Sequence, residues 1–214
     1  MTTLSDIDVL CSICQTKSSQ VVITSTSEFG HYDLDTRPPE MRRSTIFCWI
    51  QKCPTCGYCA PDLAECDEET KQVVSSDDYK TILSDTTFPE LARSFLAFSL
   101  ISEVTQQYAH AAWAAIHATW ICDDKADAAA RNCRLQAISK IRLASANFVR
   151  IAEDTGATEA ITIDLYRRAG LFDEATKLIE QLHEDSLGSV IRGVVRYQSE
   201  LIEMQDVSAH TIPA

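Results

Sequence analysis

The feature that most constrains this chain is a Cys-x-x-Cys motif that occurs twice near the N-terminus. One copy runs from Cys11 to Cys14 and the other from Cys53 to Cys56, with Gly57 directly after it. Two residues between the cysteines let the backbone turn tightly, so both sulfurs of a pair reach one metal ion at about 2.3 Å. Gly57 permits the positive φ that such a turn often needs. Cys11, Cys14, Cys53 and Cys56 therefore predict a closed, structural four-thiolate site, and Zn²⁺ is the ion that suits it best.

Other side chains near the two motifs leave alternative ligand sets open. A local site of Cys53, Cys56, Cys59 and Cys66 is conceivable, but it leaves the first motif without a role. His31 is a candidate substitute ligand. A thioredoxin-like redox pair is disfavoured because no βαβ pattern surrounds either motif. The chain has nine cysteines, an odd count, and metal binding explains the two motifs better than disulfides in a reducing compartment.

Composition predicts a folded protein that avoids polyanions. Of the 214 residues, 45% are hydrophobic and 23% are charged, which is typical of a globular chain. The formal net charge of −12 repels phosphate backbones and anionic membrane surfaces. The N-terminus lacks the features of a signal peptide, and no stretch approaches the roughly 18 apolar residues that span a bilayer. We therefore predict a cytoplasmic protein that binds neither nucleic acid nor membranes.

The segment between the two motifs is predicted to form strands. Residues 20–26 are β-branched and bounded by polar residues, and residues 45–51 are rich in aromatic and β-branched side chains. The second run is apolar on both faces, so we expect the zinc ribbon to cover one face and a helical part the other. Residues 1–70 are thus predicted to form a small zinc-ribbon domain with short β-strands.

Residues 33–43 bring opposite charges together around two prolines. The charged candidates for a binding site are Asp33, Asp35, Arg37, Arg42 and Arg43. The two prolines hold Arg37 in an extended conformation. One interpretation is a structural loop whose ion pairs fix the ribbon against the helices. The other is a recognition loop, because arginine forks suit a carboxylate or phosphate ligand. Buried, paired arginines favour the first interpretation, and an open pocket shared with His31 favours the second.

Two stretches of the N-terminal third also carry a resemblance to a known family. They are Asp-Leu-Asp-x-Arg-Pro-Pro from residue 33 and Trp-Ile-Gln-x-Cys-Pro-x-Cys-Gly-Tyr from residue 49. With them the chain resembles an uncharacterised prokaryotic family of the DUF2225 type. The resemblance implies zinc binding by Cys11, Cys14, Cys53 and Cys56, and a helical C-terminal part. It implies no activity.

The rest of the chain, residues 71–214, is predicted to be a helical domain, which makes the fold class α+β, mainly α. Apolar residues recur at three- and four-residue spacing. The predicted helices are residues 76–83, 88–101, 108–121, 126–153 and 189–204, with Asp123 and Asp124 capping the fourth. Cys122 and Cys133 are predicted to be apolar fillers. His110 and His117 lie seven residues apart, too far to share one metal, and are predicted to be core or surface residues.

Residues 160–184 match the spacing of a tetratricopeptide repeat (TPR). The matching positions are Tyr166, Gly170, Phe172, Ala175, Ile179 and Leu182. Tyr166 would fill the groove between two antiparallel helices, Gly170 would make the turn, and Ala175 would allow a close crossing. The match is partial, so we predict TPR-like antiparallel helical hairpins rather than a regular array.

No common catalytic motif is present in the sequence, neither a phosphate-binding glycine loop nor G-x-S-x-G nor H-E-x-x-H. A four-cysteine shell also leaves no open position for a substrate water. The function predicted is a non-catalytic, zinc-stabilised scaffold that binds a protein partner of basic character. The alternative is a sensor or enzyme for an anionic small molecule, using Asp33, Arg37, Arg42 and Arg43 near the zinc site.

Overall fold

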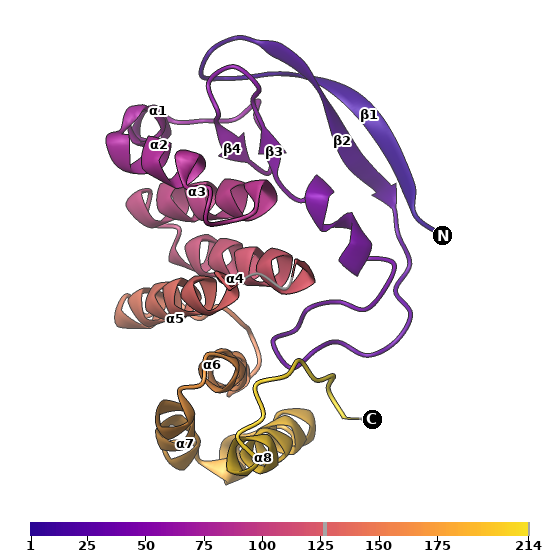
Figure 1. Ribbon diagram of the computed structural model, residues 1–214, viewed down its shortest axis with the longest axis vertical. Helices are drawn as coiled ribbons and strands as arrows, with labels where there is room; N and C mark the ends of the chain where they lie inside the picture. The colour runs from indigo at the N-terminus through magenta and orange to yellow at the C-terminus, as the bar shows by residue number, and fades with distance from the viewer. Residues whose placement is uncertain (126–127, 214) are drawn as a thin grey trace.

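The computed structural model in Figure 1 describes residues 1–125 and 128–213. A small β part precedes a column of helices, so the predicted class, α+β and mainly α, is confirmed. The strands are β1 (Thr3–Leu10), β2 (Lys17–Ser25), β3 (Gln51–Lys52) and β4 (Cys59–Ala60). The helices are α1 (Glu68–Ser75), α2 (Asp77–Ser84), α3 (Glu90–Val104), α4 (Tyr108–Asp124), α5 (Ala130–Ala146), α6 (Ala157–Arg168), α7 (Phe172–Glu180) and α8 (Ser189–Glu203), with two short 3₁₀ helices, η1 (Arg43–Cys48) and η2 (Glu184–Ser186).

The β part consists of two antiparallel pairs, β1 with β2 and β3 with β4. The strand predicted at residues 20–26 lies almost wholly within β2, whereas the strand predicted at residues 45–51 is wrong. Most of that segment is the 3₁₀ helix η1. Local hydrogen bonds explain the difference, because Thr45 Oγ1 donates to the carbonyl of Arg42 and accepts from Trp49 Nε1. These bonds close a helical turn despite the β-branched composition.

Most predicted helices are found near their expected positions. Ser76 caps α2, since its hydroxyl accepts from the amide of Tyr79. The helix predicted at residues 126–153 is present but shorter than expected, and residues 126–127 lie outside the described part of the chain. The helix α5 already ends at Ala146, and Asp123 and Asp124 form the last turn of α4 instead of a cap. Phe148 has a φ of +60° and stops the helix there.

The C-terminal helices pair as the sequence predicts, with α6 and α7 joined by a turn at Gly170, whose φ is +74°. The helix α8 corresponds to the predicted final helix. Among the described residues, no helix is both long and apolar enough to cross a bilayer. The assignment of these hairpins to a TPR-like class stays a prediction.

The segment between β2 and β3 lies along one side of the helical column and reaches the C-terminal tail (Figure 1). Leu34 N donates to the carbonyl of His210, and Ile212 N donates to the carbonyl of Tyr32. The tail is held in turn by buried Arg167, whose guanidinium donates to the carbonyl of Ser208. The N-terminal third therefore contacts the helical column far beyond its first helices.

An aromatic cluster joins this segment to α3 and α4. The ring of His117 lies 5.1 Å from Trp49, 5.3 Å from Phe95, 6.0 Å from Trp113 and 4.8 Å from Trp120, measured between ring centroids. Burial among these rings lowers the pKa of His117 to about 3, from an ordinary value of 6.5. His117 is thus a half-buried residue that is neutral at physiological pH.

The lowered pKa of His117 predicts a loss of stability in mild acid. Below pH 6.5 the unfolded chain binds a proton at His117 but the folded chain does not, so the free energy of unfolding falls as pH falls. Between pH 7 and pH 5 this contribution is about 2 kcal/mol. We expect His117→Phe to remove it. Thermal unfolding of wild type and His117→Phe across this range measures how steeply the free energy of unfolding changes with pH. The other titrating groups contribute equally to both proteins, so the difference between the two slopes reports on His117. Parallel pH profiles would contradict the prediction.

Candidate metal centre

Two similar turns present the predicted ligands. The first follows β1 and the second joins β3 to β4. In each, the amide after the second cysteine donates to the carbonyl of the first, Gln15 to Cys11 over 2.8 Å and Gly57 to Cys53 over 3.0 Å. The backbone of both donor residues is in the left-handed conformation, with φ of +60° at Gln15 and +75° at Gly57. The positive φ predicted at Gly57 is therefore present, and a glutamine adopts the same conformation in the first turn.

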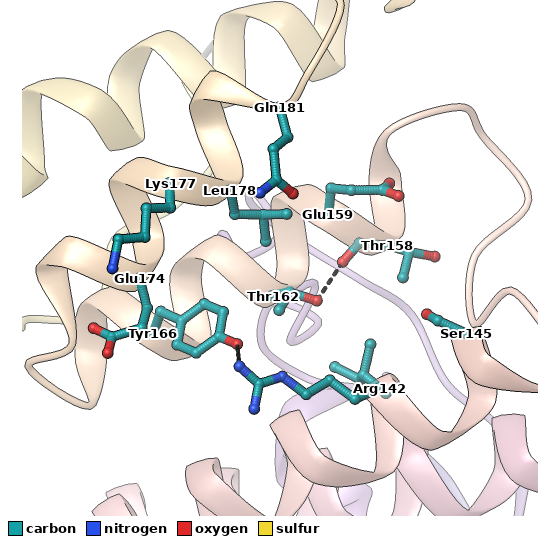
Figure 2. Close-up of a pocket in the computed structure, with 11 residues that line it drawn as sticks. Arg142, Ser145, Thr158, Glu159, Thr162, Tyr166, Glu174, Lys177, Leu178 and Gln181 are labelled. Carbon is teal, nitrogen blue, oxygen red and sulfur yellow. Dashed lines mark hydrogen bonds between the residues drawn. The ribbon is translucent and has the colours of Figure 1, made fainter.

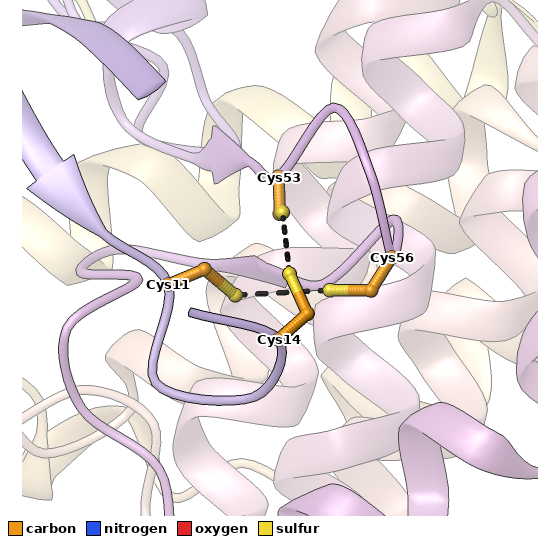
Figure 3. Close-up of side chains that lie close together, drawn as sticks. All are labelled: Cys11, Cys14, Cys53 and Cys56. Carbon is orange, nitrogen blue, oxygen red and sulfur yellow. Dashed lines mark hydrogen bonds between the residues drawn. The ribbon is translucent and has the colours of Figure 1, made fainter. Parts of the chain in front are cut away.

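The four predicted ligands converge on one point (Figure 3). All four sulfurs lie within 4.8 Å of one another, with 3.7 Å from Cys11 to Cys56 and 3.5 Å from Cys14 to Cys53. Sulfurs bound at about 2.3 Å to one tetrahedral ion are about 3.8 Å apart, whereas a disulfide is far shorter. The spacing fits a shared metal ion. Across the described residues, no second group of three or more His, Cys, Asp or Glu side chains comes close enough to hold an ion.

The alternative ligands lie outside this cluster. Cys59 is fully buried, and its thiol donates to the carbonyl of Gly57. Its amide donates to the hydroxyl of Tyr79, which itself donates to the same Gly57 carbonyl. Tyr79 comes from α2 and ties the second turn to the helical column. Cys66 and the exposed His31 do not join the cluster.

The local environment shifts the pKa values of the clustered thiols in opposite directions. Hydrogen bonding with the hydroxyl and backbone of Thr16 lowers the pKa of Cys14 to about 6. Burial raises the pKa of Cys11 and of Cys56. Four thiolates at these distances repel one another, so full ionisation requires a cation at their centre.

The arginines of residues 33–43 are already paired with carboxylates. Arg37 donates to both oxygens of Asp124 over 2.6 Å, Arg43 lies 2.7 Å from Asp33, and Arg42 lies 2.5 Å from Glu28. Arg37 is buried, while Arg42 is exposed. Two of the three partners lie outside the loop, which the sequence did not indicate. The arrangement is an ion-pair network that fixes the loop against α4.

Asp35 is the centre of the buried part of this network. It is fully buried and accepts from Trp120 Nε1 over 2.8 Å, from Arg168 over 3.2 Å and from the amide of Arg37 over 3.2 Å. Arg168 also donates to Asp123 over 2.7 Å. The contact between Asp35 and Arg168 spans most of the chain, and no local pattern marks it.

We expect Asp35→Asn to destabilise the folded protein by about 3 kcal/mol, because it removes a buried charge that Arg168 still needs. Urea unfolding followed by circular dichroism measures the change as a lower midpoint at constant slope. The matched control is Arg42→Gln, which breaks an exposed ion pair and should cost less than about 1 kcal/mol. Equal midpoints for the two variants would contradict the central role of Asp35.

Comparison of the chain with protein-family models, with curated proteins and with solved structures finds no match in any of the three. The resemblance to the DUF2225-type family therefore stays a prediction, and the case for function rests on the geometry above.

Proposed function

We propose that this protein is a non-catalytic scaffold, stabilised by a structural Zn²⁺, that binds a protein partner. The observation that carries the proposal is the cluster of Cys11, Cys14, Cys53 and Cys56 within 4.8 Å. Zinc accepts four thiolates in tetrahedral geometry and has no redox chemistry of its own. Four protein ligands complete that geometry, so a substrate water has no position on the ion.

The ion would hold together two turns that are distant in sequence. Cys11 and Cys53 are fully buried, and the second turn is anchored to α2 through Tyr79. A ribbon fixed in this way sets the position of the long segment that follows β2. The stacked helical hairpins then offer rigid surfaces to a partner, as helical repeats do. A net charge of −12 favours a partner of basic character.

The alternative function, a sensor or enzyme for an anionic small molecule, has less support. It needs guanidinium groups that are free to meet a ligand. Each of Arg37, Arg42 and Arg43 instead pairs with a carboxylate of the protein. An incoming anion would have to displace these carboxylates.

Loss of one ligand should release the ion. We expect Cys53→Ser to lose stoichiometric zinc and to unfold the first ~65 residues, while the helices keep much of their circular dichroism signal, because a metal site of this kind contributes directly to folding. The matched control, Cys66→Ser, changes the neighbouring cysteine outside the cluster and should retain the metal. Zinc quantitation on both variants decides the ligand set. Stoichiometric zinc in Cys53→Ser would contradict the assignment.

Affinity purification of this protein from its native host tests whether it binds a protein partner. The purification is then repeated in the opposite direction, with the captured protein as bait. The expected result is a partner that wild type and Cys66→Ser bind and that Cys53→Ser loses. Turnover of an anionic metabolite by the zinc-loaded protein, abolished by Arg37→Gln, would instead establish the alternative function.

A further inference from the structure

A groove follows the seam between the chain after the second cysteine turn and helices α3 and α4. It has two adjoining parts, a cavity of about 620 Å³ and a smaller slot of about 170 Å³. Pro61, Phe98 and His110 line both parts, so the two cavities adjoin at these side chains. We refer to the whole as the seam groove and to its smaller part as the aromatic slot.

The aromatic slot is apolar and rigid. Its walls include Trp49, Phe98, Trp113 and His117. Trp113 Nε1 donates to the carbonyl of Ile151 over 2.9 Å, and Trp49 Nε1 donates to a threonine hydroxyl over 3.0 Å, so the polar atom of each indole is satisfied. Hydrogen bonds thus fix both rings. His117 makes no hydrogen bond within the described part of the chain and stays neutral at physiological pH. An uncharged, ring-lined slot suits an aromatic side chain.

The larger part of the seam groove is acidic. Asp62, Glu65 and Asp67 line it, and neither lysine nor arginine is among the described residues that line either part. Ser102 is nearly fully buried at this end, and its hydroxyl has no hydrogen-bond partner among the described residues. A buried hydroxyl without a partner is unfavourable, and a polar group of a bound chain can satisfy it.

A second cavity is less selective. It measures about 410 Å³ and lies between α5, α6 and α7 (Figure 2). Its lining mixes Arg142 and Lys177 with Glu159 and Glu174, so charge favours neither a basic nor an acidic ligand. The seam groove, by contrast, combines one sign of charge with one apolar slot.

We propose that the seam groove binds a basic segment of a partner protein, with an aromatic side chain in the aromatic slot and lysine or arginine side chains over Asp62 and Glu65. This inference rests on the proposed scaffold function and states the chemistry of its partner. Charge complementarity carries it, because the acidic lining and the net charge of −12 attract a basic chain. The apolar slot adds specificity by selecting one anchor residue within that chain.

Three synthetic peptides test the proposal on the zinc-loaded protein. The probe is Lys-Lys-Tyr-Lys-Lys, and the controls are Lys-Lys-Ala-Lys-Lys, which lacks the anchor, and Glu-Glu-Tyr-Glu-Glu, which reverses the charge. All three tryptophans of the chain belong to the aromatic cluster, so tryptophan-selective fluorescence reports on the slot. We expect each control to bind at least about tenfold more weakly than the probe. Equal binding of the tyrosine and alanine peptides, or no binding of the probe, would overturn the proposal.

Variants of the protein locate the binding. Phe98→Ala removes a wall of the slot and should lower the affinity for the probe peptide by about tenfold. Glu65→Lys reverses an exposed charge that has no ion-pair partner in the described chain, and it should lower the affinity for the probe peptide by about fivefold. The matched control Glu200→Lys makes the same change in α8 and should bind as wild type does. Glu65→Lys keeps the test valid even if Phe98→Ala fails to fold.

The same variants separate this inference from the scaffold function. A partner captured equally by wild type, Phe98→Ala and Glu65→Lys would leave the scaffold function standing and overturn the seam groove as its site. A partner lost from Glu65→Lys but retained by Glu200→Lys supports both.

Discussion

The convergence of four cysteine sulfurs on one point is the constraint on which the N-terminal architecture depends. Two turns bring their sulfurs within 4.8 Å, a distance that ionised thiolates tolerate only around a cation. The strands on either side of the second turn are too short to hold it in place alone, since β3 and β4 have two residues each. The hydrogen bonds of Tyr79 tie the second turn to the helices. Shared coordination of the metal ion proposed above would fix both turns at that position.

From that fixed point the chain between the two turns lies along the helical column. Asp35 anchors it to Trp120 and Arg168, and Arg37 anchors it to Asp124. A segment with little regular structure is thus ordered by buried charge pairs, which are costly to break once formed. The two cysteine turns hold the ends of this strip of chain, and the network of Asp35 and Arg37 holds its middle. The seam groove begins at the end of this strip, where Trp49 forms one of its walls, and continues between the chain after the second turn and helices α3 and α4.

Local sequence patterns predicted the parts of this structure that depend on interactions between residues close together in the sequence. Cysteine spacing predicted which four sulfurs come together, Ser76 marked a helix start, and Gly170 marked a turn. The prediction was wrong where the hydrogen bonds of Thr45 close a helical turn in η1, and where Phe148 adopts a positive φ after α5. The exposed strand β1 was missed because few of its residues are buried, which weakens the alternation expected of a strand.

The ion pairs could not be predicted because their partners come from distant parts of the chain, as Arg168 does for Asp35. The backbone hydrogen bonds of Tyr32 and Leu34 with residues 210–212 also join segments that are far apart in the sequence. This separation affects the rate of folding. During synthesis, an early segment must wait for the last helix and its tail to emerge before it can complete its backbone hydrogen bonds. Such long sequence separation slows folding. The molecule therefore closes late, and its nascent N-terminal region spends the longest time without its final neighbours.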